Sequence, residues 1–249
     1  MTSVTARLGE GGRGDRPRRP SPGWRFERCT GRAGPLHDRA LPGTPARTVS
    51  VLQVERPALV LGSAQSDADA DPAACRAAGV EVVRRHSGGG AVLVDPESVL
   101  WVDVVLPAGD PLWDGDVGRS FGWLGDAWAA ALGAVVPAAA IGVHRGTLVA
   151  GEWSRRACFA GLGPGEVTVD GRKAVGLSQR RTRAGARFQC AVHVAGDGGA
   201  RPVDLGAVAD LLALGAEERR AARAHLARFS VALPTSAARL VSSLRAALP

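Results

Sequence analysis

The pattern of apolar and polar positions predicts a domain built mainly from short strands. Val49–Val54 and Ala58–Leu61 are apolar runs rich in β-branched residues, and Arg56-Pro57 separates them, so they predict two strands. Similar runs predict further strands at 80–85, 91–94, 99–106, 143–150, 166–169, 173–177 and 186–194. Asp170-Gly171 is a strong two-residue hairpin signal, so the strand beginning at Lys173 should pair with the one before it.

Helical spacing is clearest in the middle of the chain and at its end. Phe121, Leu124, Trp128 and Leu132 recur at helical intervals and predict a helix over 118–132 with a buried aromatic face. A shorter helix should begin at Asp71-Pro72 and end at Gly79. The last part of the chain predicts helices at 205–214, 216–229 and 236–248, the last one capped by Ser236.

The composition divides the chain into three segments. Residues 1–23 are rich in Gly, Arg and Pro and predict a disordered basic tail. Residues 24–196 contain all the predicted strands and should form the main domain, and 197–249 should form a helical C-terminal extension. We see no internal repeat.

Charge and cysteine content exclude several classes of function. The formal net charge is +7, but the basic residues do not interleave with aromatic ones and there is no tyrosine, which argues against a nucleic-acid-binding protein. A basic surface suits an acidic protein partner instead. The four cysteines show no C-x-x-C spacing, so no metal site is expected. No long apolar run or signal peptide is present, which favours a cytoplasmic protein with no membrane contact.

Lys173 is the only lysine in a chain whose other long cationic side chains are all arginine. A compact ammonium and a planar guanidinium are not interchangeable, so a single retained lysine indicates a specific role. The alternative is a surface lysine retained by chance.

A run of three glycines, Gly88-Gly89-Gly90, follows the predicted strand that ends with Arg84 and Arg85. Glycines let the backbone approach a ligand closely and turn its N–H groups toward it, and the arginines supply cations for an anion such as a phosphate. A plain connection between two strands is the alternative interpretation.

These two stretches together carry a family resemblance. Arg84-Arg85-His86-Ser87-Gly88-Gly89-Gly90-Ala91-Val92, followed by Asp95, closely resembles the lipoate-binding signature of lipoate–protein ligases. Asp170-Gly171-Arg172-Lys173-Ala174-Val175-Gly176 resembles their catalytic-lysine motif. Biotin–protein ligases and octanoyltransferases belong to the same superfamily, and the resemblance covers roughly residues 45–195.

The resemblance implies an α+β fold, a mixed β-sheet flanked by helices. It also implies that a lipoyl or octanoyl group is attached to a lysine of a lipoyl carrier domain, in 2-oxoacid dehydrogenase complexes or the glycine cleavage H protein. In the ligases of the family, ATP and Mg²⁺ first convert lipoate or octanoate to an acyl-adenylate. We adopt this ligase mechanism as the leading hypothesis.

The resemblance also assigns roles by position. Lys173 would contact the acyl carbonyl and the phosphate oxygens, where a fixed cation could be worth roughly 3 kcal/mol. The substrate and nucleotide would be bound by residues of both motifs: Arg84, Arg85, Ser87, Gly88, Gly89, Gly90, Ala91, Val92, Gly176 and Ser178.

One departure from the ligase pattern leaves a second mechanism open. Ligases commonly carry an Arg-Asn-Asp segment before the lysine hairpin, whereas Gly163-Pro164-Gly165-Glu166 stands here and the chain has no asparagine. The stretch Ala157-Cys158-Phe159, with Glu166 and Lys173, resembles the corresponding segment of cysteine-dependent octanoyltransferases. Those enzymes take the acyl group from a thioester, for example one borne by an acyl carrier protein. Cys158 would then be a catalytic nucleophile.

Other interpretations of these residues remain. Cys158 could be a small buried apolar residue, as free cysteines often are, and Cys190, in an alternating strand, is expected in the core. A non-catalytic homologue that binds an acyl group or a nucleotide is a third possibility. The basic cluster Arg180, Arg181 and Arg183 is either a solvated loop or a docking site for an acidic carrier domain.

Overall fold

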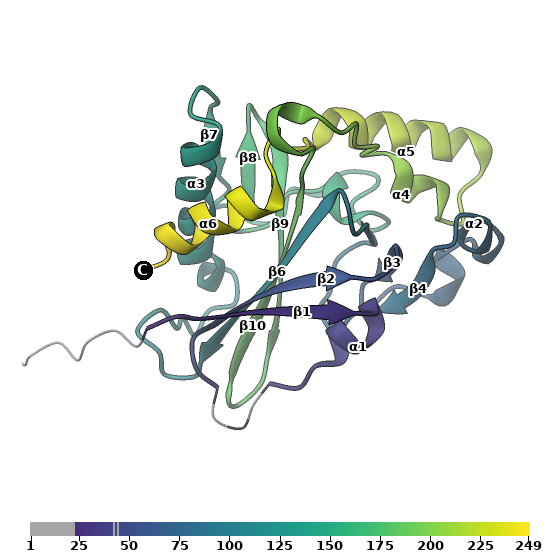
Figure 1. Cartoon of the computed structure of the whole chain (residues 1–249). Coiled ribbons are helices and arrows are strands. Elements are labelled where there is room, and N and C mark those ends of the chain that lie inside the picture. Colours follow the sequence, from purple (N-terminus) through teal and green to yellow (C-terminus); the bar gives the residue numbers. More distant parts are fainter. Residues whose placement is uncertain (1–22, 42, 44) are drawn as a thin grey trace, which may run out of the picture.

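The computed structural model describes residues 23–41, 43 and 45–249. In these ranges the chain forms a seven-stranded sheet, in the order β1-β2-β6-β10-β9-β8-β7, and a three-stranded sheet, in the order β4-β3-β5. The larger sheet is mixed, since β1 and β2 pair in parallel and its other pairs are antiparallel. Helices flank both sheets (Figure 1), so the expected α+β architecture is confirmed.

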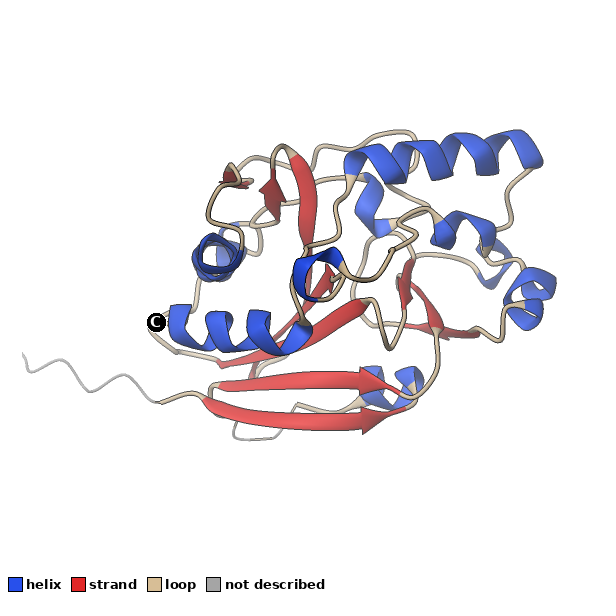
Figure 2. Ribbon diagram, turned by 45° about the horizontal axis from the view of Figure 1, so that its top comes forward, coloured by secondary structure: helices blue, strands red, loops and turns tan. Residues whose placement is uncertain are grey.

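The strands are β1 (Arg25–Gly31), β2 (Thr48–Val54), β3 (Ala58–Leu61), β4 (Glu81–Arg84), β5 (Val92–Val94), β6 (Val99–Pro107), β7 (Ile141–Val143), β8 (Val167–Val169), β9 (Arg172–Arg181) and β10 (Gly185–His193). The α-helices are α1 (Ala33–Asp38), α2 (Pro72–Ala77), α3 (Gly122–Val135), α4 (Ala207–Asp210), α5 (Ala216–Phe229) and α6 (Ala237–Ala247). Short 3₁₀ turns include η2 (Arg119–Phe121) and η3 (Cys158–Ala160). Figure 2 shows α6, the helix next to the C-terminus, lying alongside the long strands of the larger sheet.

One face of the larger sheet, which we call the helix face, is covered by α3 and α6. On β10 this face carries Phe188, Cys190 and Val192, all buried in one apolar cluster with Trp128 of α3 and Leu240 of α6. The predicted aromatic face of α3 is therefore confirmed as core, as is Cys190. Burying these side chains supplies much of the driving force for folding.

The opposite face, which we call the cavity face, carries Arg187, Gln189 and Ala191 of β10 because successive side chains of a strand alternate. The smaller sheet and α1 pack over part of it, through an apolar cluster that includes Leu36, Val60 and Trp101. The other side of the smaller sheet packs on η3, α4 and α5 in a third cluster. The cavity face is therefore enclosed at one end of the sheet and open at the other.

The Asp170-Gly171 hairpin forms as predicted. Asp170 has φ 49° and Gly171 φ 75°, the left-handed pair that a tight turn of this class requires. Two residues farther on, the pairing of β9 with β8 shifts: Val175 is opposite Val167, but Lys173 is opposite Thr168. One extra residue on β9, Ala174, therefore forms a bulge, and strict alternation no longer decides where Lys173 points.

Two predicted elements are wrong. No strand covers 144–150, because β7 ends at Val143 and the chain turns there, with the His144 ring hydrogen-bonded to the Thr147 carbonyl at 2.7 Å. The helix predicted over 205–214 is only α4, because backbone groups beyond it are used elsewhere: the Leu211 carbonyl accepts from Asp71 N and Ala213 N donates to Asp69 O. The predicted tail at 1–23 falls, apart from Gly23, outside the described residues.

Candidate active site

The centre of the candidate site is the turn η3, which carries Cys158. The backbone N–H of Cys158 donates to the Ala91 carbonyl at 2.8 Å, and the N–H of Ala91 donates to the Arg156 carbonyl at 2.9 Å. The end of the glycine loop and the segment before η3 thus form a parallel bridge, Ala91 with Ala157. The end of the glycine run therefore lies directly against the cysteine turn.

The third glycine of the loop is required by this close approach. A Cβ on Gly90 would lie 2.7 Å from backbone atoms of Ala157, closer than such atoms ever come. A second close contact lies nearby, since a Cβ on Gly62 would be 1.9 Å from the Gly89 carbonyl oxygen. Gly89 itself has φ +97°, a conformation that favours glycine. Gly90 therefore allows the backbone to pack against the segment before η3, and Gly62 allows close packing against the glycine loop itself.

Arg85 holds the glycine loop from inside. Its guanidinium is buried and donates to the carbonyls of Gly88 at 2.7 Å, Gly90 at 2.9 Å and Val60 at 3.2 Å. Burial lowers the pKa of Arg85, and the nearby Cys158 side chain acts in the opposite direction. Arg85 thus brings positive charge beside the cysteine.

Arg84 points elsewhere. Its guanidinium forms an ion pair with Asp67 and also donates to the carbonyls of Gly62 and Gln65. The two neighbouring arginines therefore have different contacts. Arg85 faces the interior of the site, whereas Arg84 connects the loop at 62–67 to β4.

Lys173 is almost fully buried, and its ammonium is surrounded by acceptors. It donates to the carbonyl oxygens of Cys158 at 2.8 Å and Gly161 at 2.9 Å, and it lies 2.6 Å from a carboxylate oxygen of Glu166. An ammonium has three N–H bonds, so all three have protein acceptors. In this arrangement Lys173 clamps both ends of η3 to β9.

Glu166 is fixed as firmly as its partner. One of its oxygens accepts from Leu177 N at 2.9 Å, and the other accepts from Gly163 N at 2.7 Å and faces the Lys173 ammonium. Because both charges are buried, either one alone would be costly. The bulge at Ala174 makes this pair possible, because it turns Lys173 toward the side of β9 on which η3 lies.

A cavity of ≈ 40 Å³ opens beside η3, between the cavity face of the larger sheet and the smaller sheet. Cys158 and Arg85 lie on its wall with mostly apolar neighbours, among them Val92, Val94, Trp101 and Leu177. The volume holds little more than a water molecule, so a larger ligand must displace part of the wall.

A polar chain runs along one side of this cavity. The Ser87 hydroxyl bonds to the Ser178 hydroxyl at 3.0 Å and to Gln189 Oε1 at 3.2 Å, and the Gln189 amide contacts His37 Nδ1 at 3.0 Å. The His37 ring stacks on Trp101 with centroids 4.2 Å apart. Burial, aided by the nearby Arg85, lowers the pKa of His37 to about 3, so this ring is neutral at physiological pH.

The structure brings together most residues expected from the sequence. Arg85, Val92, Cys158, Gly176 and Ser178 line the cavity. Of the remaining expected residues, Ser87, Gly90, Ala91 and Lys173 support it from behind, Gly88 and Gly89 lie on the exposed side of the loop, and Arg84 faces Asp67. His37, Trp101, Gln189 and the clamping role of Glu166 were not predicted, because their proximity depends on pairings between distant strands.

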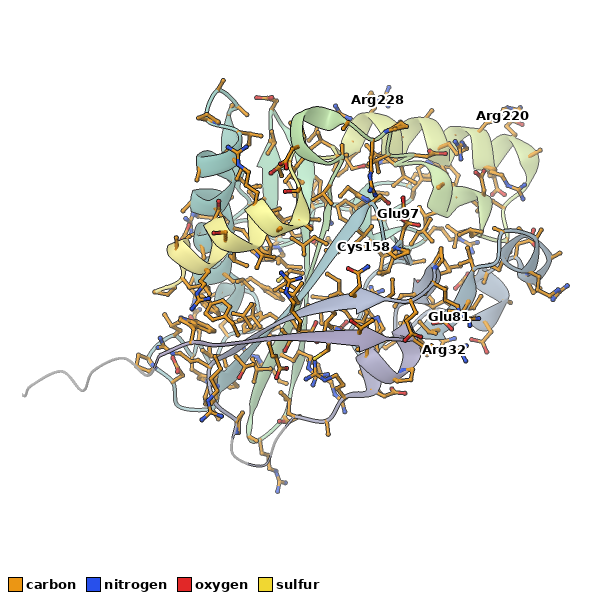
Figure 3. The ribbon with its side chains drawn as sticks, viewed as in Figure 1. Arg32, Glu81, Glu97, Cys158, Arg220 and Arg228 are labelled. Atoms are coloured by element: carbon orange, nitrogen blue, oxygen red, sulfur yellow. The ribbon has the colours of Figure 1, made fainter. Side chains whose placement is uncertain are left out.

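Figure 3 shows Cys158 in the middle of the molecule, beneath α5, whereas Arg220 and Arg228 project outward from that helix. Cys158, the candidate nucleophile, is therefore separated from these two exposed arginines. Within the described ranges, no helix is both long and apolar enough to cross a bilayer.

The sequence matches a family model described as the lipoyl protein ligase A/B catalytic domain, over residues 36–225. The chain belongs to the lipoyl protein ligase A/B family. The matched range, residues 36–225, includes His37, the glycine loop, η3 and the Lys173 hairpin. All the residues that line the Cys158 cavity therefore fall inside it. A search of curated proteins gave no significant match.

Solved structures of the lipoyl protein ligase A/B type share the fold. One is the bi-partite lipoate protein ligase of Thermoplasma acidophilum, from a study with its E2 lipoyl domain, with TM-score 0.66 and 16% identity over 91% of this chain and 82% of that one. Another is a lipoate protein ligase from the same organism with bound lipoic acid, with TM-score 0.54 and 15% identity over 90% and 94%. A third is a lipoate-protein ligase A bound with ATP, with TM-score 0.56 and 14% identity over 90% and 93%.

Proposed function

We propose that this protein transfers an octanoyl or lipoyl group, through a thioester on Cys158, to a lysine of a lipoyl carrier domain. The observation that carries the proposal is that the glycine loop and the Lys173–Glu166 pair both hold η3, the turn that presents Cys158 to an apolar cavity. Two separate motifs thus converge on one thiol, which a merely structural cysteine would not require.

The reaction takes two balanced steps. The Cys158 sulfur bonds to the carbonyl carbon of an acyl thioester donor, and the donor thiol leaves with the proton. The amine of the carrier lysine then bonds to the same carbon, the bond from that carbon to the Cys158 sulfur breaks, and a proton from the amine restores the Cys158 thiol. Splitting the transfer in this way replaces one difficult step by two easier ones.

The cavity suits an alkyl acyl group. Its apolar neighbours Val92, Val94 and Trp101 favour a hydrocarbon chain, and Arg85 places a cation beside the reacting centre. Because the cavity is small, the chain has to displace part of its wall on entering.

Lys173 has a defined part in this reaction. By binding the carbonyls at both ends of η3, it fixes the position of the sulfur without touching the substrate. Contact of Lys173 with an acyl carbonyl, as the resemblance implies, stays a prediction and requires the release of at least one of its three acceptors.

Ligation through an acyl-adenylate is the second candidate. The N–H groups of Gly88, Gly89 and Gly90 have no acceptor within the described part of the chain, and consecutive free N–H groups around a positive φ form an anion-binding concavity. These groups fit the phosphates of ATP, the nucleotide bound by one structural relative. Mg²⁺ would be held chiefly by those phosphates and water, because the described residues contain no group of three metal-ligating side chains.

The acceptor we propose is the lipoyl domain of a 2-oxoacid dehydrogenase complex or the glycine cleavage H protein. The relative from Thermoplasma acidophilum was studied together with its E2 lipoyl domain, and the net charge of +7 suits an acidic carrier.

One experiment separates the candidates. The protein is incubated with apo lipoyl domain and either an octanoyl thioester or octanoate with ATP and Mg²⁺, and the masses of both proteins are measured. We expect an octanoyl adduct on Cys158, removable by neutral hydroxylamine, and octanoylated lipoyl domain with the thioester alone. Product only with ATP would establish the ligase instead, and no product from either donor would indicate a non-catalytic binding protein.

A further inference from the structure

A second cavity, of ≈ 260 Å³, lies farther along the cavity face of the larger sheet. Three arginines line it, Arg39 after α1, Arg180 on β9 and Arg187 on β10, and its described lining includes no acidic residue. The predicted basic cluster at the end of β9 is thereby divided. Arg181 faces away and lies over the Trp113 ring, and Arg183 is exposed at the turn, so only Arg180 reaches this cavity.

Arg180 and Arg187 are direct partners across β9 and β10. Like charges directly opposite each other destabilise a sheet, so their presence needs a compensating benefit. Arg187 is buried, with Nε 3.5 Å from Asp103, and Arg39 forms an ion pair with Glu27 at 2.6 Å. The Arg180 guanidinium, by contrast, has no hydrogen bond or ion pair with any residue that the structure describes.

The electrostatics of this cluster agree with its geometry. Burial lowers the pKa of Arg187, Asp103 opposes that change, and Arg39 and Arg180 lower the pKa further. Arg39 and Arg180 therefore both repel the Arg187 guanidinium. An anion bound between them would relieve this repulsion and would accept charge-assisted hydrogen bonds from Arg180.

The position of the arginines limits which anion they can bind. Three successive residue pairs of β9 and β10 lie on the cavity face: Gly176–Ala191, Ser178–Gln189 and Arg180–Arg187. The first of these pairs borders the Cys158 cavity. The arginine pair lies four residues along the strand from Gly176, which corresponds to about 13 Å. The phosphate of an acyl-adenylate is bonded directly to the acyl group, so it cannot reach that far from the reacting carbon.

A pantetheine arm has the required length. The bonds from its sulfur to its phosphate are about as many as in four peptide residues, so the extended arm spans roughly 14 Å. Its amide and hydroxyl groups would pass Ser178 and Gln189, the polar pair between the two cavities. The row of pairs therefore matches, in order, a thioester, a polar arm and a phosphate.

We propose that Arg180, with Arg187 and Arg39, binds the phosphate of a 4′-phosphopantetheine thioester whose acyl group reaches Cys158. This inference rests on the proposed transfer from a thioester donor. The arm can be borne by coenzyme A or by an acyl carrier protein, and both present the same phosphate and the same reach.

The test compares two donors that differ only in the phosphate, octanoyl-4′-phosphopantetheine and octanoyl-pantetheine, with the full-length protein and apo lipoyl domain. We expect wild type to have a KM about tenfold lower for the phosphorylated donor. Arg180→Gln should abolish that preference by raising the KM of the phosphorylated donor alone. Arg183→Gln, which changes the same charge at the adjacent turn, should keep the wild-type preference.

Several outcomes would overturn the inference. Equal KM values of the two donors in wild type, an unchanged preference in Arg180→Gln, or an equal loss with both donors would each do so. A wild-type protein that forms no octanoyl adduct with either donor would overturn the proposed function as well. Assays with octanoyl-coenzyme A and with octanoyl carrier protein then identify which molecule carries the arm, since Arg180→Gln should raise the KM of the donor that the protein uses. If Arg180→Gln raises the KM of the carrier protein but not that of octanoyl-4′-phosphopantetheine, Arg180 binds the surface of the carrier protein instead, and the inference is wrong.

Discussion

The two faces of β10 show how one strand serves both folding and chemistry. On the helix face, Phe188, Cys190 and Val192 are buried among apolar side chains, and burial raises the pKa of the Cys190 thiol far above its ordinary value. On the cavity face, Arg187 and Gln189 take part in ion pairs and hydrogen bonds with residues of other elements. The strand alternates between these two environments at every residue.

Polar atoms that lack a hydrogen-bond partner occur on both sides of the sheet. Among the described residues, buried polar atoms without a hydrogen-bond partner include His37 Nε2 and Arg85 Nε on the cavity side and Trp123 Nε1 and Trp128 Nε1 of α3 on the helix side. Such groups cost stability, and they tend to be retained where a ligand or a reaction uses them. Of the residues with such atoms, His37 and Arg85 line the Cys158 cavity.

The largest effect should separate the two cysteines. Cys158→Ser should lower acyl transfer at least about a thousandfold, because serine is a far weaker nucleophile near neutral pH. Cys190→Ala should keep the activity per folded molecule and lose about 1 kcal/mol of unfolding free energy, because it removes a buried sulfur from the helix face. Transfer kinetics and denaturant titrations measure both. Near-native turnover in Cys158→Ser would leave the ligase mechanism as the better account.

The next effect concerns the buried ion pair. Lys173→Met leaves Glu166 charged and unpaired, so we expect a loss of roughly 3–5 kcal/mol of unfolding free energy together with lost activity. Adding Glu166→Gln should recover much of the stability but not the activity, because η3 is still unclamped. Lys173→Arg should also be inactive, since a planar fork cannot occupy the same site. Recovered turnover in the double variant would show that Lys173 matters only for folding.

Lowering the pH should reduce the free energy of unfolding through buried groups on the cavity face. Burial lowers the pKa of His37 to about 3 and that of His193 to about 4, so below pH 6.5 both take up protons only when the chain unfolds. Asp103 acts in the opposite direction, since burial raises its pKa to about 6 and the folded state binds that proton first. With two histidines against one carboxyl, lowering the pH from 7 to 5 should cost roughly 2 kcal/mol.

Chemical denaturation at the two pH values measures this loss. His193→Gln should reduce it substantially, because one of the two groups that charge on unfolding is removed. A loss that stays unchanged in this variant would mean that other groups determine the acid response.

The smallest effect distinguishes two glycines of one loop. Gly90→Ala should lower transfer about tenfold, because its Cβ would press on Ala157 and displace η3. Gly88→Ala is the matched control, since its Cβ meets no atom within 4 Å. If the loop chiefly binds phosphates, the two substitutions should have similar effects on the ATP-dependent reaction.

Much of the fold could be predicted because the signals were local. The apolar runs at 49–54 and 58–61, the Asp170-Gly171 turn and the helix at 216–229 all appear within a few residues of the predicted bounds. The six-residue α1 was not predicted, because it contains Gly34 and Pro35 and has no apolar period long enough to detect. Its position depends on Leu36 packing under the smaller sheet.

The sequence indicated candidate residues for the site but not their geometry. Both motifs indicated a binding site, and the sole lysine indicated a specific role. Lys173 is in fact buried and is not a surface lysine. The sequence could not show that Gly90 packs on Ala157, that the bulge at Ala174 turns Lys173 toward η3, or that Arg187 lies opposite Arg180. Each of these depends on a pairing register, which is decided by the whole sheet.

The backbone of Lys173 is held from the far end of the chain. Its carbonyl accepts from the N–H of Val231 at 3.0 Å, just after α5, and the two segments form a parallel bridge. A protein shortened to the strands and the first helices would therefore lose a support of its own lysine. A shortened form of this protein that is meant to keep the candidate site must therefore retain α5 and the two residues after it, up to Val231. A protein split before Ser230 should bind its carrier and donor only when both halves reassemble.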